Sequence, residues 1–197
     1  MKIVIATKNK GKVKEFSALL YKENIEILSL EDFPEMPEIV ENGVTFMENA
    51  LLKAKETVRF TGLCSLADDS GLETDALGGM PGVLSARFAP TPAECIEKLL
   101  KMMENVPVEK RTARFKCALA LVRPDGFKWT CEKSCEGIIT NKPSGNSGFG
   151  YDPVFFYKPM GKTFAEIEID IKNEISHRGK ALKEFLKAVK NNGIIAG

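Results

Sequence analysis

The sequence predicts an α/β fold in which helices flank a central mixed β-sheet. Residues 2–6 form an apolar run, and a polar loop joins this run to apolar residues at helical spacing, the pattern of a strand–loop–helix unit. Residues 112–122 alternate in character, and a Pro-Asp-Gly turn signal separates them from 128–139, which predicts an antiparallel hairpin. A hairpin beside strand–helix units indicates a mixed sheet. No repeat, low-complexity tract or linker divides the chain, so we expect a single domain over residues 1–197.

The composition argues against several classes of protein. The 28 Lys and Arg residues nearly balance the 27 Asp and Glu residues, so the bulk charge attracts neither nucleic acid nor an anionic membrane. The first apolar run is too short for a secretory signal, and no segment has the length of a transmembrane helix. Cys131 and Cys135 lack a second cysteine pair or a nearby histidine for zinc. We expect a cytoplasmic protein with reduced thiols and no nucleic-acid or membrane partner.

The loop after the first predicted strand has the residues of an anion site. Thr7 and Asn9 can donate directed hydrogen bonds, and three lysines add positive charge. The helix that follows would point its first N–H groups at the mouth of the loop, where a phosphate could bind. The spacing is not that of a Walker loop. A solvated, lysine-rich helix start is the alternative interpretation. The candidate residues are Thr7, Lys8, Asn9, Lys10, Gly11 and Lys12.

Two adjacent acids form the centre of the predicted site. Asp68 and Asp69 follow the apolar segment 63–66, so we expect them at the end of a buried strand, with Ser70 and Gly71 turning the backbone sharply. Because successive strand side chains point to opposite faces, one aspartate can face a cleft while its neighbour has another role. Carboxylates at a strand end suit a hard cation such as Mg²⁺, or the activation of a water. Taken alone, the stretch is also typical of an ordinary polar turn.

A further acid precedes the second predicted helix. Residues 31–43 contain two prolines and several acids, which predicts an extended acidic loop. Thr45 and Glu48 have the spacing of a capping box, and apolar residues at helical spacing follow them. Glu41 lies just before this helix. A solvated loop acid is the default interpretation of Glu41, and the alternative is that it completes a cation site with Asp69.

A glycine-rich loop is predicted at residues 143–153. Its three glycines allow close approach to a ligand, and Phe149 and Tyr151 could form a stacking platform for a base. The alternative is a mobile surface loop whose aromatic side chains pack into the core. The residues of this segment do not by themselves favour either interpretation.

The last predicted helix begins near Ser176 and places His177 and Arg178 in its first turn. The helix dipole disfavours positive side chains there unless they serve an anion, so the pair favours ligand contact. A structural or solvated histidine is the alternative. Capping-box patterns at 91–94 and 163–166 predict two further helix starts.

Five motifs together closely resemble those of a known family. They run from residue 7 to residue 182, so the resemblance covers nearly the whole chain. The motifs are Thr7-x-Asn9-x-x-Lys12, Glu41-x-Gly43-x-Thr45-Phe46-x-Glu48-Asn49-Ala50, Ala67-Asp68-Asp69-Ser70-Gly71-Leu72, Gly148-Phe149-Gly150-Tyr151-Asp152-Pro153 and Ser176-His177-Arg178-Gly179-Lys180-Ala181-Leu182. The family that they resemble is that of the inosine triphosphate pyrophosphatases, also called XTP/dITP diphosphatases, which act on non-canonical purine nucleotides.

This resemblance implies a Mg²⁺-dependent hydrolysis of ITP, dITP or XTP to the monophosphate and pyrophosphate, by water attack at the α-phosphorus. It also implies an elongated mixed α/β domain with two lobes around a substrate cleft, and a homodimer. Asp69 would be the catalytic acid–base residue or mainly a metal ligand, and Glu41 would bind the metal with it. Residues 7–12 would hold the phosphates. The substrate would further contact Ser70, Phe149, Gly150, Tyr151, Asp152, Lys172, His177 and Arg178.

Selection of the base has a physical basis. Hypoxanthine and xanthine carry a 6-oxo group where adenine carries an amino group. Donors such as His177 and Arg178 would satisfy the oxo group and leave an amino group unpaired. An unpaired buried polar group costs about 1–3 kcal/mol, or roughly tenfold to hundredfold in selectivity. We expect the shape near Phe149 and Tyr151 to exclude the 2-amino group of guanine.

One position departs from the family pattern. An arginine is expected after Pro143, where this chain has Ser144. If that arginine anchors the loop or the phosphates, another group must do so here, which concerns affinity rather than the type of reaction. The alternative functions are a pyrophosphatase for other modified nucleotides and a nucleotide-binding sensor without turnover. Asp69 and Glu41 argue against the sensor, because binding alone needs neither a water activator nor a full metal site.

Overall fold

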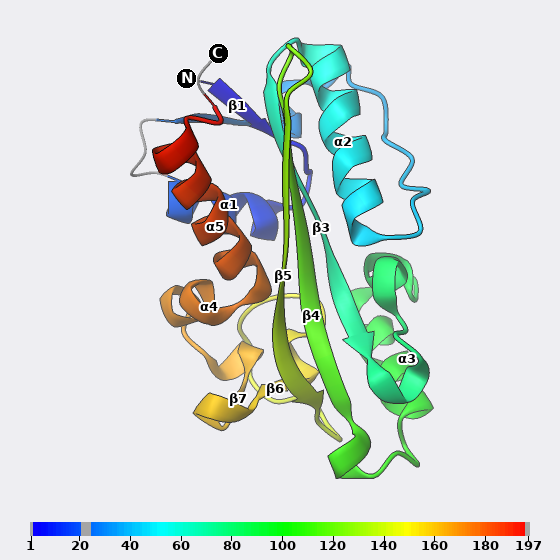
Figure 1. Cartoon of the computed structure of the whole chain (residues 1–197). Coiled ribbons are helices and arrows are strands. Elements are labelled where there is room, and N and C mark those ends of the chain that lie inside the picture. The colour runs from blue at the N-terminus through cyan, green and yellow to red at the C-terminus, as the bar shows by residue number, and fades with distance from the viewer. Residues whose placement is uncertain (1, 21–24, 196–197) are drawn as a thin grey trace. The chain divides into compact units, whose positions relative to one another are not determined.

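A computed structural model describes residues 2–20 and 25–195 (Figure 1). The strands are β1 (Lys2–Ile5), β2 (Glu26–Ser29), β3 (Cys64–Thr74), β4 (Thr112–Val122), β5 (Lys128–Ile139), β6 (Phe155–Tyr157) and β7 (Lys162–Thr163). The helices are α1 (Lys10–Leu20), α2 (Phe46–Thr61), α3 (Pro92–Met102), α4 (Ile169–Ile175) and α5 (His177–Asn192). In the described part of the chain, the strands form one sheet in the order β2-β1-β3-β4-β5-β6-β7. β1 pairs in parallel with β2 and β3, whereas β6 pairs antiparallel with β5 and β7, which confirms the predicted mixed sheet flanked by helices.

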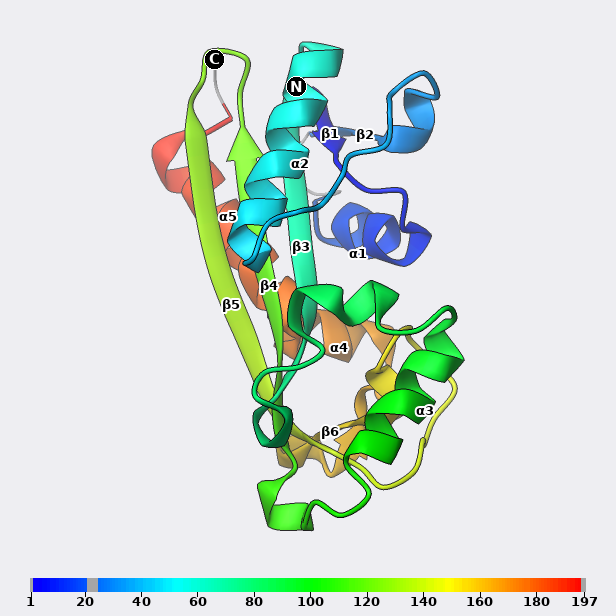
Figure 2. The same ribbon diagram turned by 90° about the vertical axis from the view of Figure 1, so that its right-hand side faces the viewer.

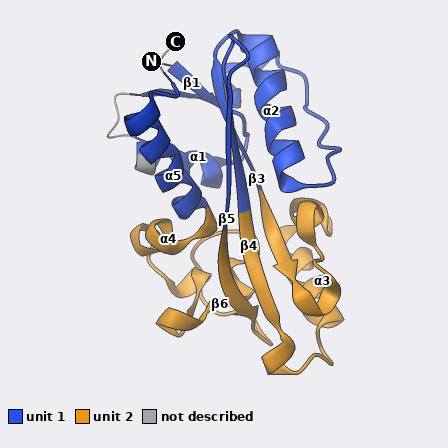
Figure 3. Cartoon of the chain, viewed as in Figure 1, with its two compact units in different colours: residues 1–69, 117–133, 178–197 blue, residues 70–116, 134–177 orange. Residues whose placement is uncertain are grey.

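The chain divides into two compact units (Figure 3). Unit 1 comprises residues 1–69, 117–133 and 178–197, and unit 2 comprises residues 70–116 and 134–177. Strands β3, β4 and β5 contribute residues to both units. Each unit has its own hydrophobic core.

In unit 1, helices cover both faces of the sheet. Helix α2 lies on one face, and α1 and α5 lie on the other (Figures 1 and 2). The core beneath α1 and α5 includes Phe16, Leu66 and Phe185, all fully buried. Because side chains alternate along β3, Leu66 faces α1 and α5 while the adjacent Ala67 faces α2. The same alternation separates the two aspartates that follow.

In unit 2, an aromatic cluster forms the centre of the core. The ring of Phe155 lies 4.6 Å from that of Phe115 and 4.8 Å from that of Phe164, measured between centroids. Contacts of this kind stabilise a core by about 0.5–1.5 kcal/mol beyond the burial of apolar area. Phe164 belongs to the short 3₁₀ turn Phe164–Glu166, so the core holds that turn in place.

The structure corrects one prediction about the site. The predicted sharp turn at Ser70 and Gly71 is wrong, because β3 continues without interruption from Cys64 to Thr74. A strand can carry two buried aspartates when cations neutralise them, and cations lie beside both Asp68 and Asp69. After the half-buried Ser70, Gly71 and Leu72 are buried again.

Other local predictions have mixed outcomes. The 112–122 and 128–139 strands, and the start of the last helix, are confirmed within a residue. Helix α4 was not predicted. The capping box at Thr45 is only half formed, since Thr45 Oγ1 accepts from Glu48 N while the Glu48 carboxylate accepts from Val44 N. None of the described helices has both the length and the apolar character needed to span a bilayer.

Candidate active site

The loop between β1 and α1 is shaped by its own side chains. Asn9 N donates to Thr7 Oγ1 over 3.1 Å, and Asn9 Oδ1 accepts from Lys12 N over 3.2 Å, so Asn9 caps α1. The first N–H groups of a helix lack acceptors within the helix, and they favour a bound anion. Lys8 and Lys10 are exposed beside this loop, and Gly11 is half-buried in the first turn. The loop therefore brings the first N–H groups of the helix and exposed lysines together.

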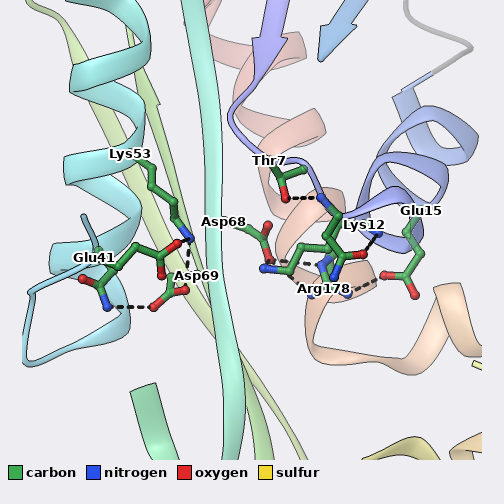
Figure 4. Close-up of polar contacts among 10 residues, drawn as sticks. Thr7, Lys12, Glu15, Glu41, Lys53, Asp68, Asp69 and Arg178 are labelled. Carbon is green, nitrogen blue, oxygen red and sulfur yellow. Dashed lines mark hydrogen bonds and ion pairs between the residues drawn. The ribbon is translucent and has the colours of Figure 1, made fainter. Parts of the chain in front are cut away.

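On one side of β3, Asp68 is held by two cations (Figure 4). Its Oδ2 lies 3.0 Å from Lys12 Nζ and 3.2 Å from both Nε and Nη2 of Arg178. Arg178 also donates to the Glu15 carboxylate through Nη1. Asp68, Arg178 and Glu15 are all buried. Burial by itself raises the pKa of Asp68, but the charges of Lys12 and Arg178 outweigh it, so the pKa lies below its ordinary value.

On the other side of β3, Asp69 belongs to a second cluster (Figure 4). Lys53 Nζ, from α2, lies 3.1 Å from Asp69 Oδ1 and 3.3 Å from Glu41 Oε1. Asn49 Nδ2 donates to Asp69 Oδ2 over 3.1 Å, and Asn49 Oδ1 accepts from Gly43 N over 2.8 Å. A Cβ at Gly43 would lie 2.7 Å from Asn49 Oδ1, so only glycine fits there. Asn49 thus ties the loop that carries Glu41 to Asp69.

The pKa of Asp69 moves in the opposite direction from that of Asp68. Burial raises it, and the Glu41 carboxylate adds to the increase, so it lies above its ordinary value despite Lys53 and Lys12. Burial lowers the pKa of Lys53, but the charges of Asp69, Asp68 and Glu41 outweigh this, and the pKa lies above its ordinary value. Asp69 is therefore the better proton acceptor of the two aspartates, and it faces a residue that stays positively charged.

The cluster around Asp69 fits a divalent metal ion. The carboxylates of Glu41 and Asp69 both contact one positive charge, that of Lys53, so their oxygens converge on a cation. No group of three or more His, Cys, Asp or Glu side chains able to hold a metal occurs among the described residues. Mg²⁺ typically uses one or two carboxylates and completes its shell with water and substrate phosphates. The two carboxylates of Glu41 and Asp69 match this pattern of coordination.

In unit 2, the glycine-rich loop is built around Asp152. Its Oδ2 accepts from Phe149 N over 2.8 Å and from Lys172 Nζ over 2.6 Å. Lys172 Nζ also lies 4.9 Å from the centroid of the Phe149 ring, a cation–π contact. A Cβ at Gly148 would lie 2.1 Å from Asp152 Oδ2. A buried ion pair thus holds this turn, and Gly150 lies exposed within it.

The two aromatic side chains of this loop differ in exposure. Phe149 is 37% exposed, whereas Tyr151 is 4% exposed and its hydroxyl donates to Ser85 O over 3.0 Å. His177 is also buried, and its ring stacks on Phe115 with centroids 4.8 Å apart. Ser70 is half-buried on β3. Of these four residues, Phe149 offers the largest exposed apolar surface to a ligand.

The sequence analysis assigned no role to three residues that complete these clusters. They are Glu15, Asn49 and Lys53. It placed Asp68 at the centre of the predicted site without giving it a separate role. Lys53 could have been found, because it lies at helical spacing from Ala50, Ala54 and Thr57 on the buried face of α2. A lysine on such a face needs a partner, and the acids of β3 supply it. Glu15, beside the buried Phe16, carries a similar signal.

These features define an α/β enzyme that acts on a phosphorylated substrate. A helix-start loop suited to phosphate, a buried lysine and a carboxylate cluster suited to a metal ion occur together in unit 1. The chain belongs to the Ham1 family, whose model matches residues 3–188. This confirms the family that the motifs predicted.

Relatives and solved structures agree with this assignment. The chain is 50% identical to a protein of Desulforamulus reducens over 95% of this chain and 94% of the relative, and that protein is named dITP/XTP pyrophosphatase. A protein of Geobacillus kaustophilus with the same name is 53% identical over 93% and 91%. The structure of a HAM1 protein from Coxiella burnetii is similar with a TM-score of 0.89, at 39% identity, covering 96% of this chain and 98% of the other.

Proposed function

We propose that this protein hydrolyses dITP, XTP and ITP to the nucleoside monophosphate and pyrophosphate, by water attack at the α-phosphorus. The family and the names of the relatives confirm the predicted class of enzyme, a nucleoside triphosphate pyrophosphohydrolase. One observation supports this mechanism above the others. Asp69 has a raised pKa and lies 3.1 Å from Lys53, while the lysine of the phosphate loop, Lys12, pairs with the adjacent aspartate.

Each group in unit 1 has a distinct task in this reaction. Asp69 would accept the proton of the attacking water, and Asn49 and Lys53 would hold its carboxylate in place. Lys12 and the first N–H groups of α1 would stabilise the charge on the departing pyrophosphate. We propose that the reaction also needs a divalent metal ion, because negative charge develops on the phosphate oxygens. We propose Mg²⁺ held by Glu41 and Asp69, where it would neutralise phosphate oxygens as a Lewis acid.

Unit 2 would supply the groups that select the base. Lys172 is buried, is oriented by Asp152 and lies above the ring of Phe149. A positioned ammonium can donate to the 6-oxo group of hypoxanthine or xanthine, and it cannot accept from the 6-amino group of adenine. Phe149 would stack on the base. The loss of one buried hydrogen bond corresponds to roughly tenfold to hundredfold discrimination.

Three further parts of the proposal concern the context of the protein. We propose one functional domain over residues 1–197, a homodimer, and a cytoplasmic location without nucleic-acid or membrane partners. The near balance of 28 basic and 27 acidic residues supports the last point. Light scattering of the purified protein would test the dimer.

Product analysis after incubation with ITP, dITP, XTP, ATP and GTP tests the reaction. We expect the monophosphate and pyrophosphate from the first three nucleotides only, and only with a divalent metal. Asp69→Asn should abolish turnover but retain nucleotide binding. The control is Glu38→Gln, a change in an exposed loop acid near Glu41, which should leave turnover unchanged. The diphosphate and orthophosphate as products would place attack at the γ-phosphorus and contradict the mechanism. Tight binding without turnover would instead indicate the sensor.

A further inference from the structure

We infer that Ser144 and Glu166 form an anchor that positions the glycine-rich loop, residues 144–153, for binding of the nucleotide base. The inference rests on the proposed function, because the role of this loop in base binding comes from it. All of the residues concerned lie in unit 2. Ser144 is also the position at which the chain departs from the family pattern.

A hydrogen bond joins the two ends of the loop, and the residues between them include three glycines. Ser144 N donates to Pro153 O over 2.9 Å, which joins the two ends. Between these ends Gly145, Gly148 and Gly150 have φ angles of 81°, 78° and 58°, values that other residues rarely adopt. A span with three such glycines has high conformational entropy when it is not held. Its position therefore depends on contacts to the rest of the unit.

Ser144 uses its remaining polar groups to fix the loop to the turn at 163–166. Its Oγ donates to Glu166 Oε1 over 2.6 Å, and its carbonyl oxygen accepts from Thr163 Oγ1 over 2.8 Å. Glu166 Oε2 accepts from Thr163 N over 2.8 Å. One carboxylate thus receives hydrogen bonds from both the loop and the turn. Charge-assisted bonds of this kind are stronger than those between neutral groups.

The backbone packs closely at the same place. A Cβ at Gly145 would lie 2.4 Å from the carbonyl carbon of Ala165, so only glycine allows this approach. Ser147 N donates to Ala165 O over 3.1 Å. Phe164, in the same turn, is fully buried in the aromatic cluster. The loop therefore docks on a turn that the core itself holds.

The anchor residue Ser144 and the base-stacking residue Phe149 belong to the same short loop. Asp152 fixes the far end through Lys172, and Phe149 lies between, 37% exposed. If the near end is released, Phe149 can move relative to Lys172. Binding of the base should weaken, while the chemistry at Asp69 should be unaffected. We therefore expect an effect on KM and little effect on kcat.

Steady-state kinetics with ITP test this inference in Ser144→Ala, Glu166→Ala and the double variant. We expect each single change to raise KM by about threefold to tenfold with kcat nearly unchanged. The double variant should be no worse than Glu166→Ala, because both changes remove the same bond. Ser144→Thr retains the hydroxyl donor and should keep KM near the wild-type value. Glu166→Gln retains only one of the two acceptor oxygens, so its KM should lie between those of the wild type and Glu166→Ala. Glu168→Ala, which changes an exposed acid close to Glu166 in the chain, is the matched control.

Hydrogen–deuterium exchange of residues 144–153 without nucleotide provides a second readout. The amides of Ser144, Ser147 and Phe149 all donate hydrogen bonds in the anchored loop, and we expect faster exchange in both alanine variants. Unchanged exchange, or a fall in kcat at constant KM, would overturn the inference. Absence of ITP turnover by the wild-type protein would overturn the proposed function instead, and the exchange measurement would still test the anchor.

Discussion

Asp68 and Asp69 share a peptide bond but lie on opposite faces of β3, and their pKa values move in opposite directions. Asp68 faces Lys12 and Arg178, whose charges favour its ionised form. Asp69 faces Lys53, but burial and the Glu41 carboxylate raise the pKa of Asp69. Alternation along a single strand thus separates an aspartate that orients cations from one that can accept a proton.

Asp68→Asn should destabilise the protein more than Asp69→Asn does. Asp68 is 1% exposed and compensates the buried Arg178 and the half-buried Lys12, and removal of one partner from a buried ion pair costs about 3–5 kcal/mol. Asp69 has a raised pKa, so its charged form is less well stabilised and a neutral amide costs less. Urea unfolding at pH 7 in EDTA measures both variants. Equal stabilities would contradict the assigned roles.

Stability should also depend on Asp68 at acid pH. Because its pKa is lower in the folded protein than in the unfolded chain, Asp68 contributes stability at pH values above its ordinary pKa of about 3.9. That contribution is lost as the pH falls through the lower, folded-state value. The wild-type protein should therefore lose more stability than Asp68→Asn as the pH falls from about 5 to about 2. In that range the Asp68 carboxylate of the unfolded chain binds a proton, whereas in the folded protein it stays ionised. Parallel curves for the two proteins would argue against this.

Lys53→Gln should lower kcat by about a hundredfold, the usual effect of removing one preorganised charge-stabilising group. Without the ammonium group, the carboxylates of Glu41 and Asp69 repel each other, and Asp69 loses a partner at 3.1 Å. Lys55→Gln is the control, because Lys55 is exposed on the same helix. Turnover rates of the two variants with ITP provide the comparison. A kcat close to that of the wild type in Lys53→Gln would remove Lys53 from the mechanism.

Tyr151→Phe should lower stability without changing base selectivity. The variant loses the hydrogen bond from the Tyr151 hydroxyl to Ser85 O, worth about 1 kcal/mol, and Tyr151 is 4% exposed. Phe149→Ala should instead raise KM for ITP, because Phe149 is the exposed ring of the loop. Thermal unfolding and the ratio of ITP to GTP turnover distinguish the two effects. A changed ratio of ITP to GTP turnover in Tyr151→Phe would show that Tyr151 takes part in selecting the base. That result would support the expectation that the shape near Phe149 and Tyr151 excludes the 2-amino group of guanine.

Signals that are local in the chain were sufficient for much of the fold. The alternation in β4 and β5, the turn signal between them and the apolar spacing of α5 each depend on residues close in sequence. The capping box at Thr91 and Glu94 formed as predicted for the same reason. Helix α4 was missed because its seven residues are too few for a clear helical period.

The sequence by itself determined the family, the class of enzyme and the short motifs, because motifs and periodicity depend on residues near one another in the chain. Only the tertiary structure decided that β3 continues through Ser70 and that Lys53 faces Asp69. It also revealed the contact between Ser144 and Glu166, which are 22 residues apart. The physical reason is that the cost of burying a charge depends on partners from other elements. Those partners are brought together by packing, and the local pattern of the sequence does not contain them.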